Sequence, residues 1–272
     1  MNMDIIPIGL FFAVSVIVVL SACEMGYQFG QFSRSRRKEE EKESPVAAIS
    51  ASILGLSAFM LAFTFGIVMD RYDARKALVR EEANAIGTAY LRSDFLPESD
   101  HHEAAGLFRR YVELRLSVTS TYDKADLHKA LAETEDIQRR LWDMGVRNAR
   151  KDMNSVVAAL YIESLNNVID IHALRVAVGL QTRVPLGIWL GLFVLVYMGM
   201  MGIGYQVAIS GSRRSWAVGI LAIAFSLVIM LIASLDRPQS KFITVSQQPL
   251  IDVLHSITDR SDEQSQSRGN RQ

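Results

Sequence analysis

The dominant pattern along the chain is four long runs without a charged side chain. The runs are Ile5–Cys23, Val46–Met69, Val184–Ala208 and Trp216–Leu235, which contain 19, 24, 25 and 20 residues. A helix needs roughly 20 apolar residues to cross the ~30 Å hydrocarbon core of a bilayer, where it satisfies its own backbone hydrogen bonds. The pattern therefore predicts an all-α, polytopic membrane protein with four transmembrane helices.

A polar region between the second and third runs predicts an inserted helical domain. Apolar residues recur there at helical spacing and predict helices over Asp100–Val118, Asp126–Arg150 and Asn154–Gln181. Asp100 and Glu103 have the spacing of a capping box. Pro185 marks either the end of the last helix or a kink leading into the third run. In the tail, we expect a short amphipathic helix after Gln248 and disorder over the last ten residues.

The second apolar run continues into charged sequence without a helix breaker. Ser44 is a favourable N-cap and Pro45 suits a first helical turn, while the next proline is Pro97. We therefore expect one helix from Pro45 to Ser93, about 73 Å long. It combines a membrane span with a polar stem.

Composition divides the chain into five segments. Residues 1–45 hold the first transmembrane helix and a charged linker, 46–93 the second helix and stem, 94–183 the helical polar domain, 184–235 the third and fourth helices, and 236–272 a polar, partly disordered tail.

The first run also has features of a cleavable signal. Leu20–Cys23 resembles a lipoprotein cleavage box, but the preceding residues contain no Lys or Arg, which a signal peptide normally has. We therefore interpret the run as a span and leave lipidation of Cys23 open. With a single cysteine, the chain has no internal disulfide and no zinc cage built on cysteines.

Charge and motifs exclude several functions. Lys and Arg number 29, as do Asp and Glu, so nothing favours nucleic acid as a partner. The sequence has no HExxH motif, nucleophile elbow or phosphate-binding glycine loop. His172 lies on an apolar helix face and is interpreted as a core or interface residue. We therefore predict no enzyme activity, catalytic residue, cofactor or metal site.

Small residues predict close packing of the membrane helices. Such residues let helix backbones approach each other in lipid. The small residues predicted to make such contacts are Ala58, Ala62 and Gly66 in the second run and Gly187 and Gly191 in the third. The spacing leaves open whether the contact lies within one chain or between chains.

Bulky apolar side chains occupy a different face of the second helix. Phe59, Phe63 and Ile67 form a stripe, which Arg71 and Arg75 continue into the stem. The stripe has two interpretations: it faces lipid or a neighbouring helix, or it forms an apolar pore neck in an oligomer. In the second case, the two arginines would make a positive pore mouth that favours anions.

Three blocks of the sequence resemble a family of bacterial membrane proteins labelled bestrophin-like. They read LAFTFGIVMDRYDARKALVREEANAIGTAYLRSDFLPE from Leu61, YVELRL from Tyr111 and LDRPQSKFITVSQQPLIDVL from Leu235. More distantly, the chain is similar to bestrophins, which are pentameric anion channels with an apolar neck and a cytosolic stem. It lacks the tryptophan-rich pattern that follows "DR" in bestrophins and the acidic run that binds calcium in animal members. The resemblance therefore does not imply calcium gating.

Together these features predict a homo-oligomeric, passive ion channel, with anions as a candidate cargo and a pentamer as a candidate assembly. The alternative is a membrane-anchored helical sensor or scaffold without transport activity. Expected partners are membrane lipid, further copies of the chain and small ions. Basic residues near the spans number seven on one side and eight on the other, and because long polar domains count for less, this near tie tilts toward a periplasmic polar domain. The resemblance implies a multi-pass protein of the bacterial inner membrane with its polar domain in the cytosol.

Overall fold

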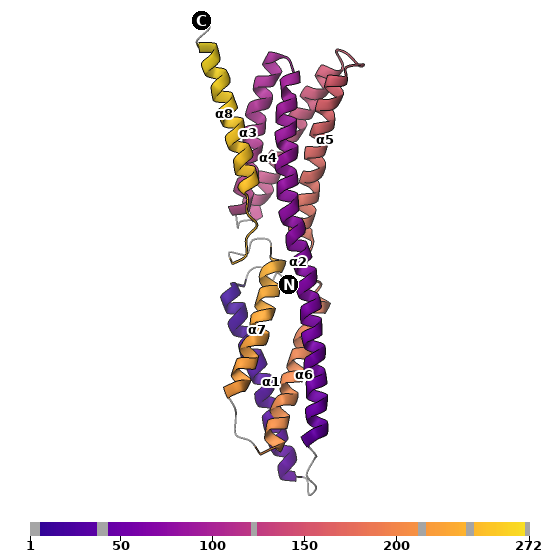
Figure 1. The fold of residues 1–272 in the computed structure, drawn as a ribbon, viewed down its shortest axis with the longest axis vertical. Helices are drawn as coiled ribbons and strands as arrows, with labels where there is room; N and C mark the ends of the chain where they lie inside the picture. The colour runs from indigo at the N-terminus through magenta and orange to yellow at the C-terminus, as the bar shows by residue number, and fades with distance from the viewer. Residues whose placement is uncertain (1–5, 37–42, 121–123, 212–215, 238–241, 270–272) are drawn as a thin grey trace. The chain divides into compact units, whose positions relative to one another are not determined.

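The computed structural model describes residues 6–36, 43–120, 124–211, 216–237 and 242–269 (Figure 1). All regular structure in these described residues is helical, which confirms the all-α prediction. The α-helices are α1 (Ile8–Arg36), α2 (Glu43–Arg92), α3 (Glu98–Ser120), α4 (Lys124–Ala149), α5 (Val156–Val176), α6 (Leu186–Ile209), α7 (Trp216–Asp236) and α8 (Gln248–Gly269). Ile5, residues 37–42 of the charged linker, Arg213, Arg214 and Lys241 lie outside the described residues.

Four helices are long and apolar enough to span a membrane, as predicted. They are α1, α6, α7 and the helix that contains the second apolar run. By its contacts the chain forms two compact units, one of residues 1–72 and 183–243 and one of residues 73–182 and 244–272. The five-segment division rests on composition and stays a prediction.

The first unit is built on the packing of α1 against α6 and α7. At Gly26 and Gly204 a Cβ atom would overlap the backbone of the facing helix, at Met201 and Cys23 respectively. Only glycine permits this approach, and small residues are what hold helices together in lipid. Cys23 itself is buried within α1, so the helix continues through the sequence that resembles a cleavage box.

Helix α2 is a single helix of 50 residues, which confirms the predicted continuous span and stem. Its residues up to Tyr72 belong to the first unit and those from Asp73 to the second. No proline interrupts it between Pro45 and Pro97, so the backbone hydrogen bonds continue across the change from apolar to charged sequence.

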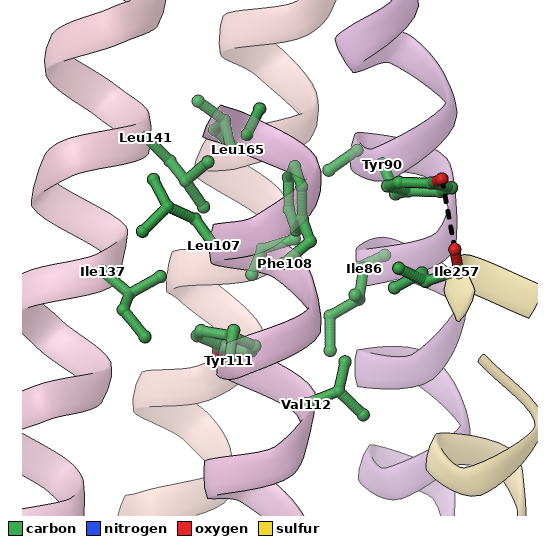
Figure 2. Packing of buried hydrophobic residues seen from close by; sticks show 14 of the residues in the cluster. Ile86, Tyr90, Leu107, Phe108, Tyr111, Val112, Ile137, Leu141, Leu165 and Ile257 are labelled. Atoms are coloured by element: carbon green, nitrogen blue, oxygen red, sulfur yellow. Dashed lines mark hydrogen bonds between the residues drawn. The ribbon is translucent and has the colours of Figure 1, made fainter. Parts of the chain in front are cut away.

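The second unit has a core of its own (Figure 2). Ile86 and Tyr90 of α2 face Phe108 and Val112 of α3, and α4 and α5 add further apolar side chains, including Ile137, Leu141 and Leu165. Figure 2 also shows the hydroxyl of Tyr90, which donates to the carbonyl of Ile257 in α8 at 3.5 Å. These buried stripes account for the helical periodicity of the polar region.

The helices of the polar region begin and end within two residues of prediction, with two differences. The capping-box prediction is wrong, because α3 begins at Glu98 and Asp100 lies inside its first turn. Pro97 explains the earlier start: its carbonyl accepts from the His101 amide at 2.9 Å. Helix α5 changes to a π-helical turn, η3 (Ala177–Gln181), and ends before α6 begins after Pro185.

The tail forms more structure than expected. Helix α8 extends to Gly269, beyond the predicted short amphipathic segment, and packs against α3. Leu250 and Ile257 are fully buried in the core of the second unit. The tail is therefore part of that core.

Candidate functional site

The apolar stripe of α2 points away from the core of its own chain. Phe59 and Phe63 are 66% and 60% exposed, whereas Leu61 and Thr64 between and beside them are buried. Ile67 is half-buried. Because these aromatic side chains have apolar surroundings only in lipid or against another chain, the stripe is the main uncovered apolar face of this helix.

The predicted small-residue faces are also uncovered within the chain. Ala58, Ala62 and Gly66 are exposed, and a Cβ atom at Gly66, Gly187 or Gly191 would meet nothing within 4 Å. Close contact inside the chain occurs instead at other glycines, for example at Gly199, which faces Leu54 of α2. Packing of the predicted residues against another copy stays a prediction.

Arg71 is part of an ion pair near the end of the apolar run. Its Nη1 lies 3.5 Å from Oδ1 of Asp236, the last residue of α7. The same carboxylate oxygen accepts from the backbone amide of Val184 at 3.0 Å. Arg75, one turn further along α2, is half-buried. Arg71 and Arg75 are therefore both half-buried, and their role at a pore mouth stays a prediction.

A second group of polar side chains lies in the core of the second unit, and we call it the buried charge cluster. Its members are Glu82 of α2, Tyr111 and Arg115 of α3, Gln138 of α4, His172 and Arg175 of α5, and Gln247 just before α8. Glu82 is completely buried, and its Oε1 accepts from Arg115 Nε at 2.8 Å. Its Oε2 accepts from Arg175.

Hydrogen bonds extend the cluster to the remaining helices of the unit. Arg175 Nη2 donates to Gln247 Oε1 at 2.6 Å, and Gln138 Nε2 donates to the Tyr111 hydroxyl at 3.2 Å. The cluster thus joins five parts of the chain through one carboxylate and two guanidinium groups. A buried carboxylate is tolerable only with such pairing.

Burial and charge set the protonation states in the cluster. Burial opposes ionisation of Glu82, but Arg115 and Arg175 outweigh it and hold the pKa of the carboxyl below its usual range. Burial, reinforced by Arg115, lowers the pKa of His172 to about 4 despite the nearby Glu82 carboxylate. Burial also raises the pKa of Tyr111. At neutral pH the imidazole and phenol are therefore uncharged.

His172 lies on the apolar face as predicted, but beside charged groups. Its Nδ1 is 4.0 Å from Glu82 Oε1, which is too long for a hydrogen bond. Among the described residues, no group of three or more His, Cys, Asp or Glu side chains could hold a metal ion.

The sequence interpretation missed the buried charge cluster. Glu82 lies in the polar stem, where charged side chains are normally solvated, yet it shares a helix face with the buried Val79, Ile86 and Ala89. Arg115 lies one helical turn after the buried Tyr111. Arg175 lies one turn after the buried Ile171 and His172. In the sequence, the buried charge cluster could have been recognised from charged residues at core positions of apolar helix stripes.

Comparison with known proteins gives the following. A family model described as Bestrophin-like domain matches residues 12–250. A point variant of a bacterial bestrophin homologue from Klebsiella pneumoniae has 15% identity and a TM-score of 0.65, with 90% of this chain and 97% of that chain covered. A further structure of a bacterial bestrophin homologue from that organism has 17% identity and a TM-score of 0.60, with 91% and 94% covered. At these identities the likeness shows the fold alone. No curated protein matches this chain.

Proposed function

This chain belongs to the Bestrophin-like family, and on that premise we propose that it forms a homo-oligomeric, passive channel for small ions, with anions preferred. One observation carries the proposal. Phe59 and Phe63 form an exposed apolar stripe on a membrane helix, on the same helix as uncovered small residues. Copies of the chain that pack through the small residues would bring the stripes together.

In such an assembly the side chains of Phe59, Phe63 and Ile67 line an apolar neck. A neck of this kind controls conduction by wetting and drying rather than by binding an ion tightly. The four apolar runs contain no charged side chain. This composition suits a passive pore better than a proton-coupled carrier, whose relays need ionisable groups within the membrane.

Chloride flux into liposomes tests the proposal. Purified protein reconstituted at defined copy number is expected to conduct, and Phe63→Ala is expected to change the flux because it widens the neck. Phe65→Ala is the matched control, since Phe65 lies two residues further along α2 on a different face and is 37% exposed. If both substitutions change the chloride flux equally, Phe63 does not line the neck. An electrically silent wild type would favour the alternative, a membrane-anchored sensor or scaffold.

We further propose that the protein lies in the bacterial inner membrane with its second unit in the cytosol. The family premise supports this orientation, since basic residues are nearly balanced between the two sides. A fluorescent protein fused after Gln272 is expected to fluoresce, and alkaline phosphatase at the same position is expected to be inactive. An active phosphatase would reverse the orientation.

A further inference from the structure

Asp236 joins three parts of the first unit through one carboxylate. It ends α7, and its side chain is only 8% exposed. Oδ1 accepts from Arg71 of α2 at 3.5 Å and from the backbone amide of Val184, just before α6, at 3.0 Å. These contacts bring the base of the proposed neck helix and the ends of two other membrane helices to the same carboxylate.

The two contacts need different properties of the side chain. The Val184 amide needs only an acceptor oxygen, which an asparagine in the same position would also supply. Arg71 carries a full positive charge, and a buried carboxylate needs such a partner. Of these two contacts, the one with Arg71 uses the negative charge of Asp236, and the one with Val184 does not need it.

The ion pair changes the electrostatic effect expected of Arg71. Its side chain is 26% exposed, so it is partly open to the surroundings of α2. A guanidinium beside a carboxylate is seen by a distant ion as a neutral pair, because the two fields nearly cancel. Arg71 therefore adds much less positive potential than its sequence position suggests.

We propose that Asp236 is a specificity-determining residue that acts through Arg71: by neutralising Arg71, it limits the preference for anions over cations. This inference rests on the proposed channel function. It adds Asp236 of α7 to the predicted mouth residues of α2, and residue spacing along α2 alone could not have indicated Asp236. Asp236 is a positioning and charge-balancing residue and does not itself need to contact the permeating ion.

The test measures the ratio of chloride to sodium permeability from reversal potentials in planar bilayers under a sodium chloride gradient. Asp236→Asn keeps the acceptor oxygen for Val184 and releases the charge of Arg71. In water, a unit positive charge about 7 Å away lowers the energy of a chloride ion by about RT and raises that of a sodium ion by about RT, so the ratio is expected to rise roughly sevenfold. Arg71→Gln is expected to lower it by a similar factor.

The double variant Arg71→Gln/Asp236→Asn makes the test specific. With both charges removed, the ratio is expected to return to that of the wild type. If Arg71 acts alone, the double variant will behave like Arg71→Gln and Asp236→Asn will have no effect, which overturns the inference. Asp236→Glu keeps the charge and is expected to keep the wild-type ratio.

Two further outcomes separate this inference from the proposed function. If Asp236→Asn fails to assemble, Arg71→Gln is compared with the double variant instead. Equal chloride-to-sodium permeability ratios of these two variants would overturn the inference. A wild type that conducts while all four variants keep its ratio overturns the role of Asp236 and leaves the channel intact. A silent wild type overturns both.

Discussion

At the scale of single residues, the most constrained side chain is Glu82. It is fully buried and receives both Arg115 and Arg175. Removing one member of a buried ionic group leaves the others desolvated and unpaired, which costs more than the pair itself contributes. Glu82 is therefore a structural anchor of the second unit, and its neighbour Glu81, which is exposed, has no such role.

Glu82→Gln is expected to destabilise the protein by about 3–5 kcal/mol, because two guanidinium groups lose their buried counter-charge. The midpoint of thermal unfolding in detergent measures the effect. Glu81→Gln is the matched control and is expected to change stability by less than about 0.5 kcal/mol. Similar melting of the two variants would mean that water or other groups satisfy the arginines.

The low pKa of His172 predicts a loss of stability in mild acid. The pKa of the folded protein, about 4, lies below the ordinary value of 6.5, so the unfolded chain binds more protons in this interval. Stability is therefore expected to fall as the pH falls from about 6.5 toward 4, by on the order of 2–3 kcal/mol. Glu82 contributes only below its ordinary value of 4.5, so pH 7 to 5 isolates His172.

Unfolding midpoints at pH 7, 6 and 5 provide the measurement. His172→Gln is expected to flatten the pH dependence relative to the wild type. His255→Gln, at an exposed position of α8, should retain the wild-type slope. If the slope of the His172 variant is unchanged, the imidazole is protonated in the folded protein through a rearrangement of the cluster.

At the scale of helices, the glycines fall into two classes. Gly26 and Gly204 lie where α1 and α6 touch, and Gly66, Gly187 and Gly191 lie on uncovered surface. The first class holds the chain together. The second class is available to hold copies together, as the small-residue pattern predicts.

Gly204→Ala is expected to destabilise the fold by about 1–3 kcal/mol, since the new methyl group overlaps the backbone at Cys23. Gly191→Ala is expected to leave the stability of the single chain unchanged and to lower the fraction of oligomer. Thermal unfolding and native mass spectrometry measure the two effects separately. If Gly191→Ala leaves the fraction of oligomer unchanged, Gly191 is not part of the proposed interface.

Sequence periodicity was sufficient for most helices and insufficient for the contacts between them. Runs without charge located the four spans, and the absence of proline located the full length of α2. The partners of Arg71 and Glu82 could not be found this way. Asp236 lies 165 residues from Arg71 in sequence, and Arg175 lies 93 residues from Glu82. Local spacing carries no information about which charges meet across such separations.

At the scale of the whole molecule, the second unit depends on a segment from the end of the chain. Helix α8 adds Leu250 and Ile257 to its core, and Gln247 completes the buried charge cluster. Burying such side chains stabilises a domain by roughly 1.5–3 kcal/mol each. The core of the second unit is therefore complete only once α8 has been made.

Truncation after Ser246 is expected to prevent stable accumulation of the protein, because the core of the second unit loses α8. Truncation after Arg260 retains Leu250 and Ile257 and is expected to fold. Yield in membranes and elution in size-exclusion chromatography compare the two. Normal behaviour of the shorter chain would show that α8 is dispensable for the second unit.

The continuity of α2 has a consequence for insertions and deletions. Val79, Glu82 and Ile86 are all buried in the second unit, on one uninterrupted helix. One inserted residue between Val79 and Glu82 would turn Glu82 by about 100° relative to Val79, so the two side chains could no longer face the same core. We therefore expect a single-residue insertion there to destabilise the second unit, because either the apolar contacts of Val79 or the ion pairs of Glu82 are lost.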